Sequence, residues 1–409
     1  MATTERRYYV LQGTYMAWAW FMGPIYPLFL LSRGLDVLQA SSVLATYFVV
    51  TFLFEVPTGA VADLFGRRVS FVLACFTRMA AFALYFFATG YVDCLIAEAI
   101  DAIGTTLASG ALDAWAVDGM REEGRQGPID RVFARAQGIA RAQMIVGGIV
   151  GGFIADYEIA LPWLIAAVGF GATGAYAMAA MHERPPASRP TWSNAHRSIA
   201  GIMRASVSAV RTTAIVRLLC LLTAAAAIGI MPVHFLWPAR LEELLAGRSL
   251  WVFGWIWALV SGVGVLGSAF AERALNRTSR EIVLFASCVV RAIGIAIAAL
   301  GSDFAIVLTG LLIMEFAFSV SSPPYQAWLN EHIAPELRAT VLSVASMSFT
   351  IGGATGLVTL GWLARSAGIP AAWTLCACVL VAVAPGYLLL GRVQRAEAAP
   401  SRTSTRASA

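Results

Sequence analysis

The sequence contains no lysine, and charged residues make up only 13% of its 409 positions, whereas 59% are hydrophobic. Soluble domains usually have about 25% charged residues, so this composition is typical of a membrane protein. All the basic residues are arginine, and the net charge is only +5. A small excess that is spread over many loops is not the signature of a protein that binds nucleic acid.

Several kinds of chemistry also lack their motifs. No GxxxxGK[ST] loop is present, which argues against ATP hydrolysis, and no CxxC or Cys/His spacing indicates a metal site. The one long polar segment has about thirty residues, too few for a catalytic domain. We therefore expect no enzyme, cofactor, metal or disulfide. All six cysteines fall within apolar segments: Cys75, Cys94, Cys220, Cys288, Cys376 and Cys378.

Long apolar runs follow one another along the whole chain. About 20 apolar residues are needed to cross a hydrocarbon core of about 30 Å. No small-residue cleavage pattern follows the first run, so we expect it to stay as the first helix. The sequence predicts an all-α membrane protein with twelve transmembrane helices near 9–31, 39–60, 69–90, 92–117, 135–157, 159–181, 214–239, 249–271, 280–301, 303–331, 337–364 and 370–391.

Two halves of the sequence resemble each other in register. LDAWAVD (112–118) aligns with YQAWLNE (325–331), and Arg78 in the third predicted helix falls opposite Arg291 in the ninth. The glycines of the fifth and eleventh predicted helices align as well. We therefore predict two six-helix pseudo-repeat bundles in parallel topology.

The long polar segment divides these helices six and six. We predict an N-terminal bundle over 1–181, a cytoplasmic linker over 182–213, a C-terminal bundle over 214–391 and a disordered cytoplasmic tail over 392–409. A surface helix is expected within the linker, near 199–210.

Arginines concentrate in the even-numbered connections. The odd-numbered connections carry mainly acids, such as Asp93, Asp156 and Asp303. By the positive-inside rule, both termini and the even connections are cytoplasmic. The arginines in question are Arg67, Arg68, Arg121, Arg125, Arg131, Arg184, Arg189, Arg197, Arg204, Arg211, Arg273, Arg277 and Arg280.

The connection between the second and third predicted helices reads FEVPTGAVADLFGRRVS (54–70), and it places Gly59, Asp63, Gly66, Arg67 and Arg68 at the spacing G-x-x-x-D-x-x-G-R-R. This motif, in this position and among twelve helices in two halves, resembles the signature of the major facilitator superfamily. The resemblance implies the fold of that superfamily for the whole chain. A plain charged loop with snorkelling arginines is the alternative interpretation.

The resemblance also implies a conformational latch on the cytoplasmic side. Asp63 would meet the N-terminus of the eleventh helix, where a carboxylate is favoured. Arg67 would bind an acid at the end of the fourth helix, with Asp118 as first candidate and Asp113 as second. In that role the loop would hold the outward-open state.

A finer resemblance is to the drug:proton antiporter branch, which includes macrolide and tetracycline exporters. It rests on FLFEVPTGAVAD and SGALDAWAVD, and on Gly138, Gly147 and Gly151 in the fifth predicted helix. The sequence departs from the antiporter signature at Gly152, where a proline belongs, and at Ala155 and Asp156, where two glycines belong. These glycines equally suit close helix packing.

The fourth predicted helix carries a polar face. At 100° per residue, Glu98, Asp101, Thr105 and Ser109 share one narrow side. An unpaired charge in hydrocarbon costs about 3 kcal/mol or more, so this side should face protein or a water-filled cavity. The resemblance implies that helices one, four, seven and ten line that cavity.

Compatible polar and aromatic residues lie on all four of these helices. Interfacial anchoring is an alternative role for the aromatic ones. The predicted substrate-binding residues are Gln12, Tyr15, Trp18, Thr105, Ser109, His234, Trp237, Ser319, Tyr325 and Gln326.

Asp101 and Glu315 are the first candidates for proton coupling, because the repeat places them at nearly equivalent depths in cavity helices, and Glu98 is next. The alternative is that an acid neutralises a buried arginine, for which Arg78, Arg141 and Arg291 are available. Arg141 and Asp113 lie at similar depth and are predicted to form a structural ion pair.

Together these patterns predict a secondary active transporter in a bacterial inner membrane, functioning as a monomer. The preferred function is export of small amphipathic compounds coupled to proton influx. The alternatives are an importer or facilitator of a small metabolite, and a transporter-like receptor that moves nothing.

Overall fold

The computed structural model describes residues 3–125, 127, 129–183, 214–245, 247, 249–331 and 335–398. Side chains are described within these ranges except at Val56 and over 329–343 and 394–398. The predicted linker helix near 199–210 lies outside the described residues.

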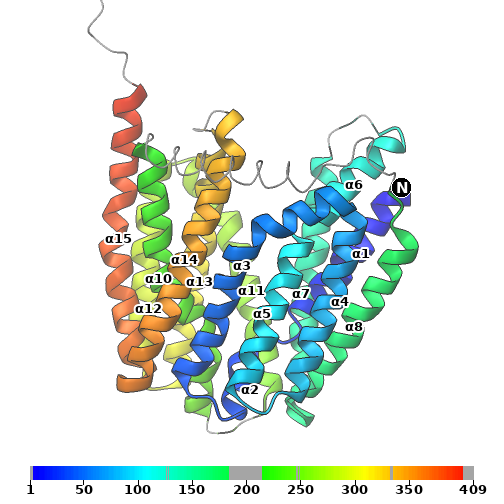
Figure 1. Ribbon diagram of the computed structural model, residues 1–409. Helices are drawn as coiled ribbons and strands as arrows, with labels where there is room; N and C mark the ends of the chain where they lie inside the picture. The colour runs from blue at the N-terminus through cyan, green and yellow to red at the C-terminus, as the bar shows by residue number, and fades with distance from the viewer. Residues whose placement is uncertain are drawn as a thin grey trace, which may run out of the picture.

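The described chain is built of helices, which confirms the predicted all-α fold (Figure 1). The N-terminal half contains α1 (Thr3–Ala19), α2 (Tyr26–Ser32), α3 (Val37–Phe65), α4 (Arg67–Phe87), α5 (Tyr91–Ala108), α6 (Ala111–Glu122), α7 (Asp130–Tyr157) and α8 (Leu161–Ala180). The C-terminal half contains α10 (Ala214–Leu245), α11 (Trp251–Leu275), α12 (Arg280–Leu300), α13 (Phe304–Glu331), α14 (Pro335–Ala367) and α15 (Ile369–Ala398).

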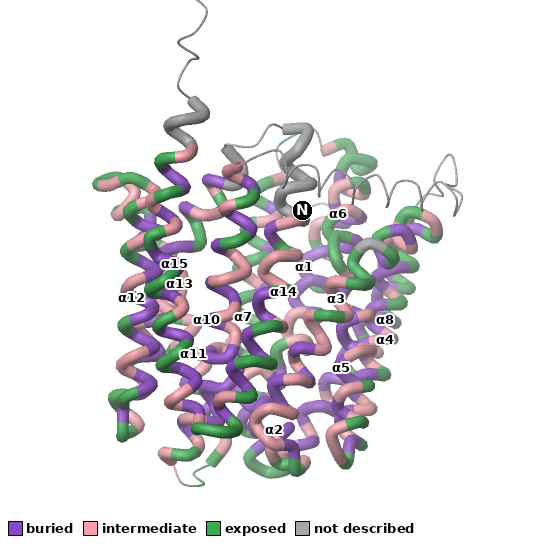
Figure 2. The backbone as a smooth tube through the Cα atoms, turned by 60° about the vertical axis from the view of Figure 1, so that its left-hand side comes forward, coloured by how far each residue is buried: buried purple, intermediate pink, exposed green. Residues whose placement is uncertain are grey.

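Eleven segments of the described chain are long and apolar enough to cross a membrane. Large apolar side chains are exposed on many helices, among them Leu53, Phe87 and Leu300. Figure 2 shows exposed and buried stretches alternating along the helices. An apolar outer surface of this kind is stable in lipid rather than in water, and the protein is a multi-pass integral membrane protein.

The first predicted span is not one continuous helix, which corrects the sequence prediction. The chain leaves α1 at Trp20, turns through 20–25 and continues as α2. Pro24 and Pro27 each lack a backbone N–H group, so the regular hydrogen-bond ladder cannot pass through this segment. Tyr26, directly after the break, packs edge-to-face against Phe235 of the other half.

The fourth predicted span is likewise divided, into α5 and α6. Gly110 has φ 68°, a left-handed conformation that glycine adopts without strain. The end of α15 also differs from prediction: this helix continues to Ala398, so the first seven residues of the predicted disordered tail are helical. Residues 399–409 lie outside the described chain.

The two halves meet along two pairs of long helices. α7 packs against α11, and α3 packs against α14. Glycines allow the close approach in the first pair: a Cβ atom added at Gly152 would lie 3.2 Å from the backbone nitrogen of Gly254. Gly152, which departs from the antiporter signature, therefore packs the halves together, whereas Gly147 and Gly151 lie against the backbone of Ala17 and Phe21 in the N-terminal half.

The described contacts between the halves gather toward the end of the molecule at which α2 lies. Arg365 Nε lies 3.3 Å from Asp36 Oδ2, and the backbone N–H of Leu250 donates to Asp156 Oδ1 at 2.5 Å. The ends of α1 and α15 where the chain begins and finishes lie at the opposite end (Figure 1). The structure is thus joined across the halves at the α2 end.

Candidate functional site

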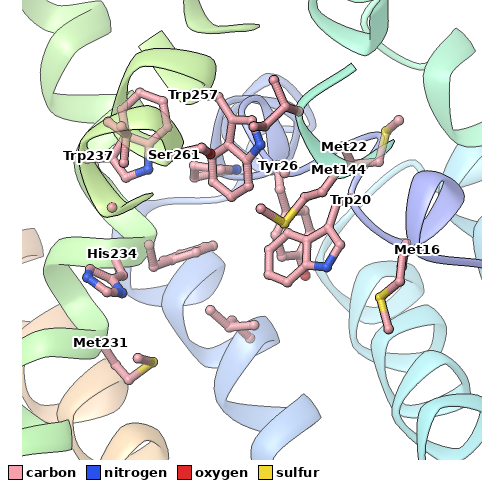
Figure 3. A pocket seen from close by; sticks show the side chains of 18 of the residues that line it. Met16, Trp20, Met22, Tyr26, Met144, Met231, His234, Trp237, Trp257 and Ser261 are labelled. Atoms are coloured by element: carbon pink, nitrogen blue, oxygen red, sulfur yellow. The ribbon is translucent and has the colours of Figure 1, made fainter. Parts of the chain in front are cut away.

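A cavity of about 850 Å³ lies between the two halves. Helices α1, α3, α4, α5 and α7 contribute to its wall from one side, and α10, α11, α13 and α14 from the other. Aromatic and methionine side chains form much of the wall, and Figure 3 shows several of them around the same space. A mostly apolar cavity with a few polar groups is the usual form of a small-molecule site.

Arg78 and Asp101 form a buried ion pair at the N-terminal wall. The Nε and Nη2 groups of Arg78 donate to the two carboxylate oxygens of Asp101 at 2.7 and 3.1 Å. The guanidinium also lies 4.6 Å from the ring centroid of Phe170. Asp101, one of two first candidates for proton coupling, is therefore held by an arginine, the alternative that the sequence left open.

Glu98 belongs to a separate hydrogen-bonded cluster on the same wall. The hydroxyl of Tyr85 donates to Glu98 Oε2, and the hydroxyls of Tyr85 and Tyr26 lie 2.9 Å apart. Tyr85 also stacks on Trp163 with ring centroids 4.1 Å apart. This carboxyl group is buried and fixed by packed aromatic rings, although it still lines the cavity.

Glu315 on α13 has looser surroundings on the opposite wall. Its Oε2 lies 3.7 Å from His234 Nε2, and the Ser319 hydroxyl lies 3.5 Å from its Oε1. His234 Nε2 is buried with no hydrogen-bond partner among the described atoms. Gly264 of α11 leaves space beside this carboxylate, because an added Cβ would lie 3.4 Å from Glu315 Oε1.

The predicted ion pair between Arg141 and Asp113 is absent from the described contacts. Asp113 instead accepts a hydrogen bond from the Tyr8 hydroxyl at 2.7 Å, because the turn at Gly110 carries α6 to the start of α1. Arg141 is exposed and lines the cavity. This prediction is therefore wrong, and Arg141 adds a positive charge to the cavity wall.

Half of the predicted substrate-binding residues line the cavity: Tyr15, Thr105, His234, Trp237 and Ser319. The other half, Gln12, Trp18, Ser109, Tyr325 and Gln326, lie outside it, which corrects the prediction.

The reasons for these corrections are local. Trp18 packs against Gly169 of α8, and Gln12 is buried on α1. Ser109 sits at the break after α5 and donates to Glu55 at 2.9 Å. The Tyr325 hydroxyl is 2.6 Å from that of Thr223 on α10, and its neighbour Gln326 is exposed outside the cavity.

The sequence analysis missed the contribution of α11 to the cavity. A helical stripe of this element faces the space, formed by Trp257, Val260, Ser261, Gly264, Val265 and Ser268. Their spacing of three and four residues is the signal that could have found them. The methionines and Trp20 carry no such periodic signal.

The signature loop lies far from the cavity, at the end of the bundle opposite α2. Arg67 forms an ion pair with Asp118, and its Nη1 also donates to the carbonyl oxygen of Ala114 at 2.8 Å. Asp63 is exposed. Its predicted contact with the start of the eleventh helix falls on side chains outside the described residues.

Glu183, which the sequence analysis did not select, caps the start of α4. Its two carboxylate oxygens accept hydrogen bonds from the backbone N–H groups of Arg67 and Arg68, each at 2.9 Å. Gly66 has φ 98°, and an added Cβ would lie 2.8 Å from Glu183 Oε2. The motif glycine is therefore required by backbone conformation and by the capping carboxylate together.

Comparison with known proteins supports this architecture. Residues 219–408 match the family model described as Major Facilitator Superfamily. The chain is 26% identical over 145 residues to an uncharacterized MFS-type transporter, YxaM, of Bacillus subtilis (strain 168). That match covers 36% of this chain and 35% of the relative.

Solved structures resemble the chain over nearly its whole length. The nucleoside transporter NupG superposes with a TM-score of 0.79 at 12% identity, covering 96% of this chain and 100% of its own. A peptide transporter, POT, gives 0.75 at 14% identity over 97% and 96%. The human organic anion transporter MFSD10 gives 0.64 at 15% identity over 95% and 99%. The chain therefore has the fold of these transporters, and its residues 219–408 match the Major Facilitator Superfamily model.

Proposed function

We propose that the protein is a secondary active transporter that exports small amphipathic compounds from a bacterial cell in exchange for protons. The observation that carries this proposal is the cavity between the halves, where an aromatic and methionine wall surrounds a few ionisable groups. Such a wall suits an apolar ring system, and the ionisable groups suit a polar end.

Alternating access follows from the way in which the halves are joined. Inter-half contacts such as Asp36 with Arg365 lie at the α2 end. With the orientation that the arginine distribution predicts, this closed end faces outward. Rocking of the halves about the cavity would break these contacts and open the cavity to the outside.

Glu315 is the favoured proton carrier in this proposal. Its 3.7 Å separation from His234 is longer than a hydrogen bond, and the cavity reaches it. Asp101 is held by two hydrogen bonds from Arg78, so its protonation would break a buried pair. Glu98 remains the second candidate.

The signature loop would act as the latch of the opposite state. Arg67 and Asp118 hold the loop against α6 in the structure, while Asp63 is exposed. Engagement of Asp63 by the eleventh helix would then accompany closure at the cytoplasmic end.

Uptake of a small metabolite is the second candidate function. The full-length likeness to a nucleoside transporter and a peptide transporter favours it, at 12% and 14% identity. Both candidates use the same cavity and differ in the direction of substrate movement relative to the proton.

Liposomes that contain purified protein and an internal pH dye test the proposal. We expect that at least one amphipathic compound in the panel, when it crosses the membrane, drives protons across it in the opposite direction. Movement of both in one direction would favour uptake. Folded protein that exchanges no compound in the panel would contradict both and favour a non-transporting receptor.

A further inference from the structure

Two tryptophans from opposite halves stack on each other inside the cavity. Trp20, at the break after α1, and Trp257, on α11, have ring centroids 5.6 Å apart and planes inclined by 29°. Both line the cavity, and Figure 3 places them close together with Met144 beside them. This stack therefore crosses the seam between the halves at the wall of the substrate cavity.

Glycines determine the position of Trp257. A Cβ added at Gly148 would lie 2.7 Å from Trp257 Cδ1, and one added at Gly23 would lie 3.3 Å from its Cζ2. The indole thus lies flat on a wall where no side chain intervenes. Its Nε1 is buried and has no hydrogen-bond partner among the described atoms.

The three tryptophans in the first two turns of α11 have different surroundings. Trp255 has 52% of its surface exposed and is absent from the cavity wall, whereas Trp257 is two residues away and therefore on the opposite face of α11. Trp251 stacks on Phe153 with centroids 5.8 Å apart. Anchoring at the membrane boundary can explain exposed tryptophans, but it does not explain Trp257.

We propose that Trp20 and Trp257 form an aromatic clamp that selects substrates with a planar, unsaturated ring. Resting on the proposed transport function, this inference names the substrate class that the cavity takes. A ring inserted between the indoles gains contact with two flat faces. Ser261 lies one turn further along α11 and also lines the cavity, so its hydroxyl can bond a polar substituent of that ring.

The present spacing of the indoles couples ring binding to the movement of the halves. Carbon atoms in contact lie about 3.5 Å apart, so a ring between two others needs a separation of roughly 7 Å. The observed 5.6 Å is too small. Because each indole belongs to a different half, the halves must move apart here before a planar ring can enter between them. A puckered ring makes less contact with two flat faces and therefore gains less binding energy from the same insertion.

Binding to the full-length protein in detergent micelles tests the clamp. The probes are two matched pairs: uridine with 5,6-dihydrouridine, and 2-naphthol with decahydro-2-naphthol. Each pair keeps its skeleton and polar groups but differs in ring flatness. In equilibrium dialysis, we expect the planar member of at least one pair to bind about fivefold more tightly than its saturated partner.

Substitutions locate that preference. Trp20→Leu and Trp257→Leu should each bind the planar and the saturated probe about equally well. Trp20→Phe and Trp257→Phe should keep part of the preference for the planar probe. Trp255→Leu, on the opposite face of the same helix, should leave it unchanged. A wild-type protein that distinguishes neither pair, or a preference that survives both leucine variants, would overturn the clamp.

Transport of the same probes separates this inference from the proposed function. Ring preference in binding without any exchange in liposomes would contradict transport and leave the clamp standing. Exchange of both members of a pair at equal rates and affinities would contradict the clamp and leave transport standing.

Discussion

The buried arginines that the repeat aligns, Arg78 and Arg291, have different partners in the two halves. In the N-terminal half, Arg78 donates two hydrogen bonds to Asp101. At the corresponding place in the C-terminal half, Arg291 is 5% exposed, and its Nε has no hydrogen-bond partner among the described atoms. It lies 5.8 Å from the Phe318 ring, while Glu315 lies toward His234.

This difference separates an arginine that is paired with a carboxylate, Arg78, from one whose described neighbours are uncharged side chains, Arg291. A buried pair with both members satisfied resists changes in charge, because removing one member leaves the other uncompensated. Glu315 has no such fixed partner in the described structure. For the proton coupling that we propose, Glu315 in the C-terminal half is therefore the preferred candidate.

The largest expected effect comes from breaking the satisfied pair. Arg78→Gln should lower the free energy of unfolding by about 3–5 kcal/mol, because Asp101 would be buried without its cation. Arg291→Gln is the matched control and should cost about 2 kcal/mol or less. Unfolding by SDS in mixed micelles gives both values.

A double variant checks the cause of that loss. Arg78→Gln combined with Asp101→Asn should recover part of the stability, since no orphaned charge remains. Two results would contradict the distinction between the paired Arg78 and Arg291. One is an equal loss of unfolding free energy in Arg78→Gln and Arg291→Gln, and the other is a double variant that is no more stable than Arg78→Gln.

A smaller effect is expected at Glu315. Glu315→Gln keeps the size of the side chain but cannot titrate, so proton-driven accumulation should fall by about tenfold or more while substrate exchange continues. Asp101→Asn should instead impair folding. Accumulation and exchange are measured in the same liposomes over roughly pH 5 to 9.

Retention of the wild-type pH dependence in Glu315→Gln would assign the proton elsewhere, with Glu98→Gln as the next variant to measure. Loss of exchange together with accumulation would make Glu315 a structural residue.

The smallest expected effect concerns a connection whose length differs between the halves. α3 passes into α4 through Gly66 alone, whereas residues 276–279 separate α11 from α12. Glu183→Ala removes the cap from α4 and should cost about 1 kcal/mol. Hydrogen exchange at the amides of Arg67 and Arg68 should accelerate, while Glu272→Ala, an exposed change near the other connection, should not alter it. Unchanged exchange in Glu183→Ala would show that the cap does not order the loop.

The sequence predicted the spans well because each apolar run must be long enough to cross the bilayer. It missed the breaks after α1 and α5, since mean hydropathy does not register the left-handed backbone of Gly110 or the N–H groups missing at Pro24 and Pro27. Local backbone geometry therefore accounts for the main errors in the fold.

The site was predictable where a spacing or a repeat carried it. Arg67 and Asp118 were matched through the signature motif, and the repeat drew attention to Arg78 and Glu315. The Trp20–Trp257 stack was not predictable, because it depends on how two distant segments meet across the seam. The predicted pairing of Arg141 with Asp113 was wrong because two residues at the same depth need not face each other. The turn at Gly110 directs Asp113 toward Tyr8 instead.

Cross-linking the closed end tests the alternating-access proposal most directly. Asp36 and Arg365 bridge the halves there, with Nε and Oδ2 3.3 Å apart. In a protein with the exposed Cys378 replaced by alanine, Asp36→Cys and Arg365→Cys can be joined by a short reducible cross-linker. We predict that the cross-linked protein loses substrate exchange and regains it on reduction, while each single-cysteine variant treated alike stays active. Full exchange with the cross-link intact would contradict movement of the halves at this end.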